Sequence, residues 1–213
     1  MVDSQVNEES YPIRGFAGGG PPSSPVAPAE PIISNARLAV LMFLAAEAMF
    51  FAGLIGAFIV FRLSSSAWPP PFQPRLPVAV TGVNTVILLL SGFTMRLALR
   101  AVRLGRPEGL ARCLLTTVLL GVLFLSIQGY EWFRLIEFGL TVSSGIYGAT
   151  FYTLIGIHGL HVLGAVLWLM VVLTQARQGR FTAERCTGVE TCSMYWTFVV
   201  GLWPVLYGLV YLY

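Results

Sequence analysis

LAVLMFLAAEAMFFAGLIGAFIVF, residues 38–61, decides the fold class of this chain. These 24 residues contain one charged side chain, Glu47. An α-helix rises 1.5 Å per residue, so the stretch would be about 36 Å long and would cross the hydrocarbon core of a bilayer with some tilt. The sequence therefore predicts a transmembrane helix here.

The composition of the whole chain agrees with this prediction. Of its 213 residues, 56% are hydrophobic and 11% are charged, whereas soluble domains are typically about 25% charged. Further apolar stretches follow, so that the predicted spans are 38–61, 78–95, 113–130, 146–174 and 191–213. We expect an all-α, polytopic membrane helix bundle with five transmembrane helices, and no nucleic-acid partner.

The first 36 residues differ from the rest. They hold six of the thirteen prolines together with the segments GFAGGG and PPSSP, a composition that buries too little apolar surface to offset the entropy lost on ordering. We expect residues 1–36 to form a disordered or loosely docked tail and residues 37–213 to form the transmembrane domain.

The arginines predict the orientation of the chain in the membrane. All thirteen basic residues are arginine, and ten of them fall in the tail, the second connection and the fourth connection, while the first and third connections hold three. Because basic residues gather in cytoplasmic segments, we expect the N-terminus inside and the C-terminus outside.

Small residues suggest how helices pack and how the cysteines behave. Within the first span, Ala48, Ala52 and Gly56 recur every four residues, a stripe that predicts close packing against another helix. The three cysteines lack the spacing of zinc or redox motifs, and we expect ordinary small apolar side chains from them. They are Cys113, Cys186 and Cys192.

Polar side chains within the spans are the candidate functional residues, because ionisable groups in a bilayer are costly. They are Glu47, Asn84, Gln128, Glu131, His158 and His161. A ligand site, a proton relay and a structural polar network are all open interpretations. We expect no catalytic residue among them.

Both histidines lie in the motif HGLHV, residues 158–162. Three positions apart on one helix face, they cannot sandwich one porphyrin, which excludes bis-histidine haem ligation. A single-histidine haem and a metal held by both histidines with Glu47 or Glu131 stay open. The favoured alternative is that His158 and His161 hydrogen-bond carboxylates or carbonyls of neighbouring helices.

Five motifs in a fixed order resemble subunit III of the haem-copper terminal oxidases, and they cover residues 38–213. The motifs are FLAAEAMFFAGLIGAF (43–58), VNTVILLLSGFT (83–94), FLSIQGYEWF (124–133), FYTLIGIHGLHVLGAV (151–166) and GVETCSMYW (188–196). The chain is similar to the shorter, five-helix bacterial form of that family.

The resemblance implies roles for individual residues. Glu47 matches the family's buried carboxylate in a lipid-facing cleft, and His161 matches a histidine near bound phospholipid, with Arg177 or Arg180 as the accompanying arginine. Interhelical polar roles are implied for five residues, which are Asn84, Gln128, Glu131, His158 and Glu190.

The resemblance also implies a function. It implies an accessory subunit of a proton-pumping cytochrome c oxidase in a bacterial plasma membrane, with no metal, haem or redox centre in this chain. Haem and copper would lie in partner subunits, namely the catalytic subunit I, subunit II and further respiratory subunits, and phospholipid would be bound. The subunit would support lipid binding and proton uptake.

One departure from the family keeps alternatives open. Where the family usually has YWHFVD, this chain has YWTFVV, with Thr197 and Val200 in place of a histidine and an aspartate. An equivalent subunit of a quinol oxidase or a nitric oxide reductase is the first alternative. A small proton-coupled transporter using Glu47 is the second, although no two halves of the chain repeat each other.

Overall fold

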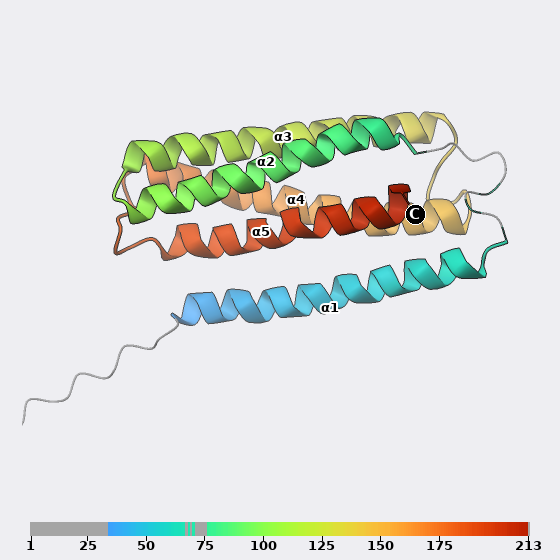
Figure 1. The fold of residues 1–213 in the computed structure, drawn as a ribbon, viewed down its shortest axis with the longest axis horizontal. Coiled ribbons are helices and arrows are strands. Elements are labelled where there is room, and N and C mark those ends of the chain that lie inside the picture. Colours follow the sequence, from blue (N-terminus) through green and yellow to red (C-terminus); the bar gives the residue numbers. More distant parts are fainter. Residues whose placement is uncertain (1–33, 67, 69, 71–75, 213) are drawn as a thin grey trace, which may run out of the picture. The chain divides into compact units, whose positions relative to one another are not determined.

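The computed structural model describes residues 34–66, 68, 70 and 76–212. Five long helices run along one common direction, and a short π-helical turn follows the last of them (Figure 1). They are α1 (Asn35–Ser64), α2 (Val78–Arg103), α3 (Pro107–Glu137), α4 (Ile146–Arg177), α5 (Thr187–Tyr207) and η1 (Gly208–Leu212). No strand occurs in the described residues, and all five helices are long and apolar enough to cross a membrane, which confirms the predicted fold class.

Most helices are longer than the predicted spans, because a helix continues through the interface until its backbone meets a terminating signal. The extension is largest in α3, which covers 107–137 where the predicted span was 113–130. At its end α2 turns through Gly105, whose φ of 64° belongs to the left-handed region that glycine adopts without strain. Helix lengths thus depend on these caps as well as on hydropathy.

The predicted tail lies almost entirely outside the described residues. Only its last three residues are described, and they begin α1, because the Ser34 hydroxyl accepts a hydrogen bond from the Arg37 backbone N–H at 3.4 Å. This is the side-chain cap that Ser commonly supplies to a helix start.

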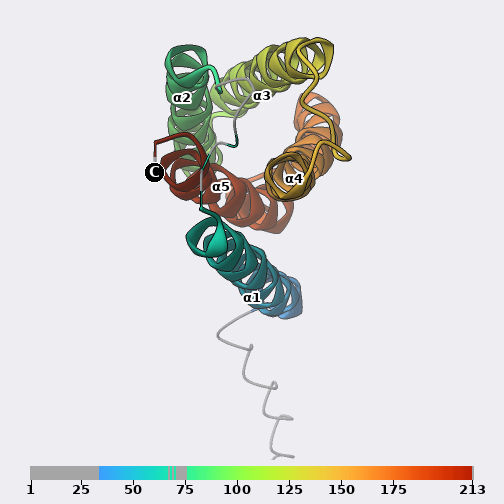
Figure 2. The same cartoon turned by 90° about the vertical axis from the view of Figure 1, so that its right-hand side faces the viewer.

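Helices α2, α3, α4 and α5 pack in sequence around a shared core, since α2 contacts α3, α3 contacts α4, and α5 contacts both α4 and α2 (Figure 2). Leu88, Phe124, Ile155, Trp196 and Trp203 are fully buried in that core. Side chains of neighbouring helices crowd Gly121 of α3, where an added Cβ would lie 2.8 Å from the Trp196 ring and 2.9 Å from Val166.

Helix α1 lies outside this four-helix group, against α5 and α4 (Figure 2). Its buried side chains are Phe51 and Phe58. The stripe of Ala48, Ala52 and Gly56 is exposed, and a Cβ added at Gly56 would meet nothing within 4 Å. The packing predicted for this stripe is therefore wrong for the described part of the chain, because bulky Phe51 and Phe58 form the contact face instead.

Candidate functional site

Glu47 of α1 and His161 of α4 form a polar pair between these two helices, about midway along their lengths. The Glu47 Oε2 lies 2.9 Å from the His161 Nε2, and the Phe51 ring stands edge-on to the imidazole at 5.1 Å. Both side chains are more than four-fifths buried, with exposed fractions of 17% for Glu47 and 19% for His161. The structure thus brings together two of the predicted cleft residues.

The contact of the second ring nitrogen of His161 indicates which ring nitrogen carries a proton. Nδ1 lies 2.7 Å from the backbone carbonyl oxygen of Ile157, one turn earlier in α4. A carbonyl oxygen only accepts, so Nδ1 must carry the proton and donate it. One further proton then lies between Nε2 and Glu47, on either the carboxyl or the imidazole, and the pair is neutral overall in both forms.

A groove lies between the same two helices, about two helical turns from this pair. Its cavity volume is about 210 Å³, and its walls come from α1 and α4. Leu54 and Leu154, two of its lining residues, each stand seven positions from Glu47 or His161, so they share a helix face with the pair. These two leucines lie about 10 Å along the helices from the polar pair, which does not itself line the groove, and two threonines of α4 line it beside its apolar residues.

Arg177 and Arg180 lie apart from the pair. Arg177 is the last residue of α4, and at 1.5 Å per residue it stands about 24 Å along the helix from His161. Arg180 follows in the connection to α5, and both arginines are exposed. The structure therefore places the predicted arginines at the charged end of the helix whose middle holds His161.

Two buried hydrogen bonds connect neighbouring helices in the core of the four-helix group. The Asn84 amide donates to the backbone oxygen of Phe124 at 3.2 Å, joining α2 to α3. The Gln128 amide donates to the Tyr211 hydroxyl at 3.3 Å, joining α3 to η1. Asn84 and Gln128 are thus interhelical polar residues in this structure.

His158 is fully buried but is held by ring contacts instead of hydrogen bonds. Its ring stacks on Trp203 with centroids 5.0 Å apart and planes 25° apart, and Phe51 stands edge-on at 6.4 Å. Neither ring nitrogen has a hydrogen-bond partner among the described residues. The hydrogen bond across helices expected for His158 is replaced by stacking, because aromatic rings surround the imidazole.

Glu131 is buried as predicted, with 6% of its surface exposed, near the end of α3. The described residues supply no hydrogen-bond donor to its carboxyl group. The structure therefore gives its burial but no partner for the predicted interhelical role.

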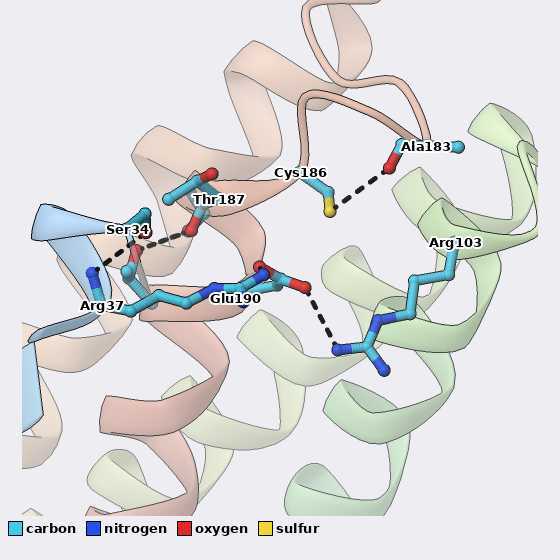
Figure 3. Close-up of polar contacts among 9 residues, drawn as sticks. Ser34, Arg37, Arg103, Ala183, Cys186, Thr187 and Glu190 are labelled. Atoms are coloured by element: carbon cyan, nitrogen blue, oxygen red, sulfur yellow. Dashed lines mark hydrogen bonds and ion pairs between the residues drawn. The ribbon is translucent and has the colours of Figure 1, made fainter. Parts of the chain in front are cut away.

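Glu190 near the start of α5 joins three helices at one end of the bundle. Its two carboxylate oxygens form ion pairs with Arg37 of α1 and, at 3.1 Å, with Arg103 of α2 (Figure 3). The Glu190 side chain is 7% exposed, whereas the Arg37 and Arg103 side chains are 40% and 60% exposed. We call these three residues the arginine clasp.

Glu190 was predicted from the sequence as an interhelical polar residue, but neither of its arginine partners was. Arg37 lies 153 residues from Glu190 and Arg103 lies 87 residues away. One signal was present in the topology, since the start of α1, the end of α2 and the start of α5 must all fall on one side of a five-helix membrane protein.

Metal ligation by the histidines has no geometric basis in the described residues. His161 Nε2 faces Glu47 while His158 faces Trp203, and no group of three or more His, Cys, Asp or Glu side chains gathers in the described part of the chain. The three cysteines are free thiols, two of them buried.

The two positions that depart from the family motif have distinct surroundings. Thr197 is exposed on α5 and lines a groove beside the arginine clasp. Val200 is buried and packs against Gly92 of α2, where an added Cβ would lie 3.1 Å from its methyl group. An apolar residue at 200 therefore suits the tight α2–α5 contact.

Comparison with known proteins extends over the whole bundle. The profile of the family described as cytochrome c oxidase subunit III matches residues 29–213. Cytochrome c oxidase subunit 3 of Synechocystis sp. is 40% identical over 174 residues, which are 81% of this chain and 73% of that protein.

Relatives from other organisms give similar matches. The probable cytochrome c oxidase subunit 3 of Nocardia farcinica is 36% identical over 80% of this chain and 84% of that protein. Cytochrome c oxidase subunit 3 of Squalus acanthias is 35% identical over 85% of this chain and 70% of that protein. The match covers all five helices, and the chain belongs to the cytochrome c oxidase subunit III family.

Proposed function

We propose that this chain is the accessory subunit III of a haem-copper cytochrome c oxidase in a bacterial plasma membrane, and that it carries no redox centre itself. The observation that carries the proposal is the family match over residues 29–213, which spans every helix of the bundle. Haem and copper then belong to the partner subunits, with oxygen reduction in subunit I and a further copper centre in subunit II.

The surroundings of the two histidines favour an accessory role in which this chain does not ligate haem. A haem iron would need an open imidazole nitrogen as its axial ligand. In this chain His161 uses Nδ1 and Nε2 for Ile157 and Glu47, and His158 is enclosed by Trp203 and Phe51. Both rings are committed to contacts within the bundle.

The groove between α1 and α4 supports the proposed lipid-binding role. An acyl chain lying in it would contact Leu54 and Leu154 and reach the Glu47–His161 pair. Arg177 and Arg180 stand near the charged end of α4, where a phosphate group would find exposed guanidinium donors. Leu154 of the groove lies about 35 Å along α4 from Arg177, so the arginines and the groove would hold different lipids, which together would support proton uptake by the catalytic subunit during turnover.

Purification in mild detergent tests the assignment to an oxidase. The full-length tagged chain should copurify with haem absorption, a catalytic subunit and a dinuclear-copper subunit identified by mass spectrometry. Haem without the copper subunit would instead indicate a quinol oxidase or a nitric oxide reductase. A colourless protein that purifies alone would overturn the proposal and make proton-coupled transport the next activity to measure.

The lipid role has a separate test in the purified complex. His161→Leu should lower the amount of bound phospholipid and shorten the period of active turnover, because α1 and α4 lose the polar contact that holds them together near the groove. Arg185→Gln, which changes an exposed arginine of the connection between α4 and α5, is the control. A His161→Leu complex with unchanged lipid content and turnover lifetime would contradict this role.

A further inference from the structure

A second groove opens beside the arginine clasp and is lined by residues of α1, α2 and α5. Its cavity volume is about 570 Å³, more than twice that of the groove between α1 and α4. Arg37, Arg103 and Glu190, which lie together in Figure 3, are its charged lining residues, and we call them its rim.

Below the rim each of the three helices contributes apolar side chains to the wall, and α5 also contributes two hydroxyl groups. Leu44 stands seven residues after Arg37, and Leu99 stands four residues before Arg103. Phe198 stands eight residues after Glu190. At 1.5 Å per residue the apolar wall extends about 12 Å from the charged rim toward the middle of the bundle.

The rim has a net positive charge and spare hydrogen-bond donors. Two guanidinium groups and one carboxylate sum to one positive charge. Each guanidinium carries five N–H donors, and the clasp uses one terminal nitrogen of each. Because the Arg37 and Arg103 side chains are 40% and 60% exposed, the remaining donors are open to a ligand.

We propose that this groove binds an anionic phospholipid, with its phosphodiester on Arg37 and Arg103 and the upper part of an acyl chain along Leu44, Leu99 and Phe198. The single negative charge of the phosphodiester matches the net charge of the rim, and planar guanidinium groups bind phosphate oxygens in pairs. A small anion or an acidic side chain would satisfy the rim but would leave the apolar wall without a contact.

The proposal does not rest on the oxidase function, because it requires only that the chain spans a membrane. It also concerns a different surface from the groove between α1 and α4, since the two grooves share no lining residue. The two lipid sites can therefore be tested separately.

Titration of lipid into the delipidated full-length chain tests the site. Phosphatidylglycerol in detergent micelles should raise the unfolding temperature of the wild-type protein at concentrations where phosphatidylcholine has little effect. Arg103→Gln should weaken this response about tenfold, the size expected for losing one charge-assisted contact. Arg100→Gln is the matched control, because Arg100 is also exposed on α2 but does not line the groove.

A second variant keeps the charged rim and fills the groove. Thr197→Phe adds a ring to the exposed α5 wall and should weaken phosphatidylglycerol binding as strongly as Arg103→Gln does. His161→Leu should leave this binding unchanged, because His161 does not line this groove.

Three results would overturn the proposal. Equal weakening by Arg100→Gln and Arg103→Gln would indicate diffuse attraction to the arginine-rich end. Equal responses to phosphatidylcholine and phosphatidylglycerol would remove the charge selectivity. Stabilisation by inorganic phosphate that matches that of the lipid and survives Thr197→Phe would indicate a simple anion site.

Discussion

At the scale of single residues, the Glu47–His161 pair shows how a bilayer tolerates two ionisable groups. A lone charge inside a membrane is costly, but this pair shares one proton and is neutral as a unit. The Ile157 carbonyl holds the imidazole in one orientation, and Phe51 covers one side of it. The chain therefore gains a polar contact between α1 and α4 without burying net charge.

Substitution of both members of this pair should reveal their coupling. In a double-mutant cycle with Glu47→Leu and His161→Leu, we expect a coupling energy of about 1 kcal/mol, typical of hydrogen bonds between membrane helices. Glu47→Gln should keep most of the coupling, because its amide N–H can donate to Nε2. Unfolding in mixed micelles measures these free energies, and strictly additive single substitutions would contradict the pairing.

Two glycines form a matched test of close packing. Gly121→Ala should destabilise the bundle by about 1–3 kcal/mol, because the new Cβ would lie under 3 Å from both Trp196 and Val166. Gly56→Ala should be neutral or slightly stabilising, since its Cβ has open space and alanine favours helix. Both variants can be compared by unfolding in the same micelles. An equal loss for the two would mean that the α3–α5 contact is looser than described.

At the scale of the elements, α1 is the helix with the fewest contacts to the rest. It packs against α5 and α4 through Phe51 and Phe58, and two polar contacts secure it at different heights. The arginine clasp connects the first turn of α1 to α5 and α2, and the Glu47–His161 pair connects its middle to α4. These two contacts fix the rotation of α1 about its own axis.

Loss of the clasp should therefore loosen α1 selectively. Glu190→Gln removes the charge that binds both arginines, and we expect a loss of about 1–2 kcal/mol, less than for a fully buried ion pair because both arginines are partly exposed. Glu108→Gln is the control, since the Glu108–Arg112 pair is highly exposed and should contribute nothing measurable.

Site-directed crosslinking between α1 and α5 measures this loosening. Single cysteines replacing Leu44 and Met194 should crosslink less efficiently when Glu190→Gln is present, while crosslinks between α3 and α4 should be unchanged. If all helix pairs responded equally, the clasp would be stabilising the bundle as a whole.

The elements themselves were predictable from the sequence, but their rotations were not. Long apolar stretches give the five helices directly, because each span needs about 20 such residues. Which face of a helix meets its neighbour depends on packing, so the exposure of Ala48, Ala52 and Gly56 within this chain could not be predicted from the sequence. The same limit hid Arg37 and Arg103, because their convergence on Glu190 requires knowing which helices are neighbours.

For the candidate site, the sequence named Glu47 and His161 because ionisable residues within a span are rare. It did not give their direct contact, which depends on the register of α1 against α4. For His158 the residue type suggested hydrogen bonding, but the structure surrounds its ring with Trp203 and Phe51. Burial could be predicted from the sequence, whereas the chemical partner could not.

At the scale of the whole molecule, the two ends of the bundle differ strongly in charge. Of the arginines in the described residues, nine lie toward the end formed by the start of α1 and the α2–α3 and α4–α5 connections. The opposite end has Arg62 and Arg134. Because basic residues are retained on the cytoplasmic side, this asymmetry predicts that the clasp and its groove face the cell interior.

Cysteine labelling at the two ends of α4 tests this orientation. In a background with the native cysteines replaced by alanine, a membrane-impermeant maleimide applied to intact spheroplasts should label Ser143→Cys, which precedes α4 on the arginine-poor side. Gln178→Cys, which follows α4 on the arginine-rich side, should react only after the membrane is opened. Both positions are exposed, so a difference in labelling reports the side of the membrane and not burial. The reverse pattern would place the C-terminus inside and would move the proposed anionic-lipid groove to the outer leaflet.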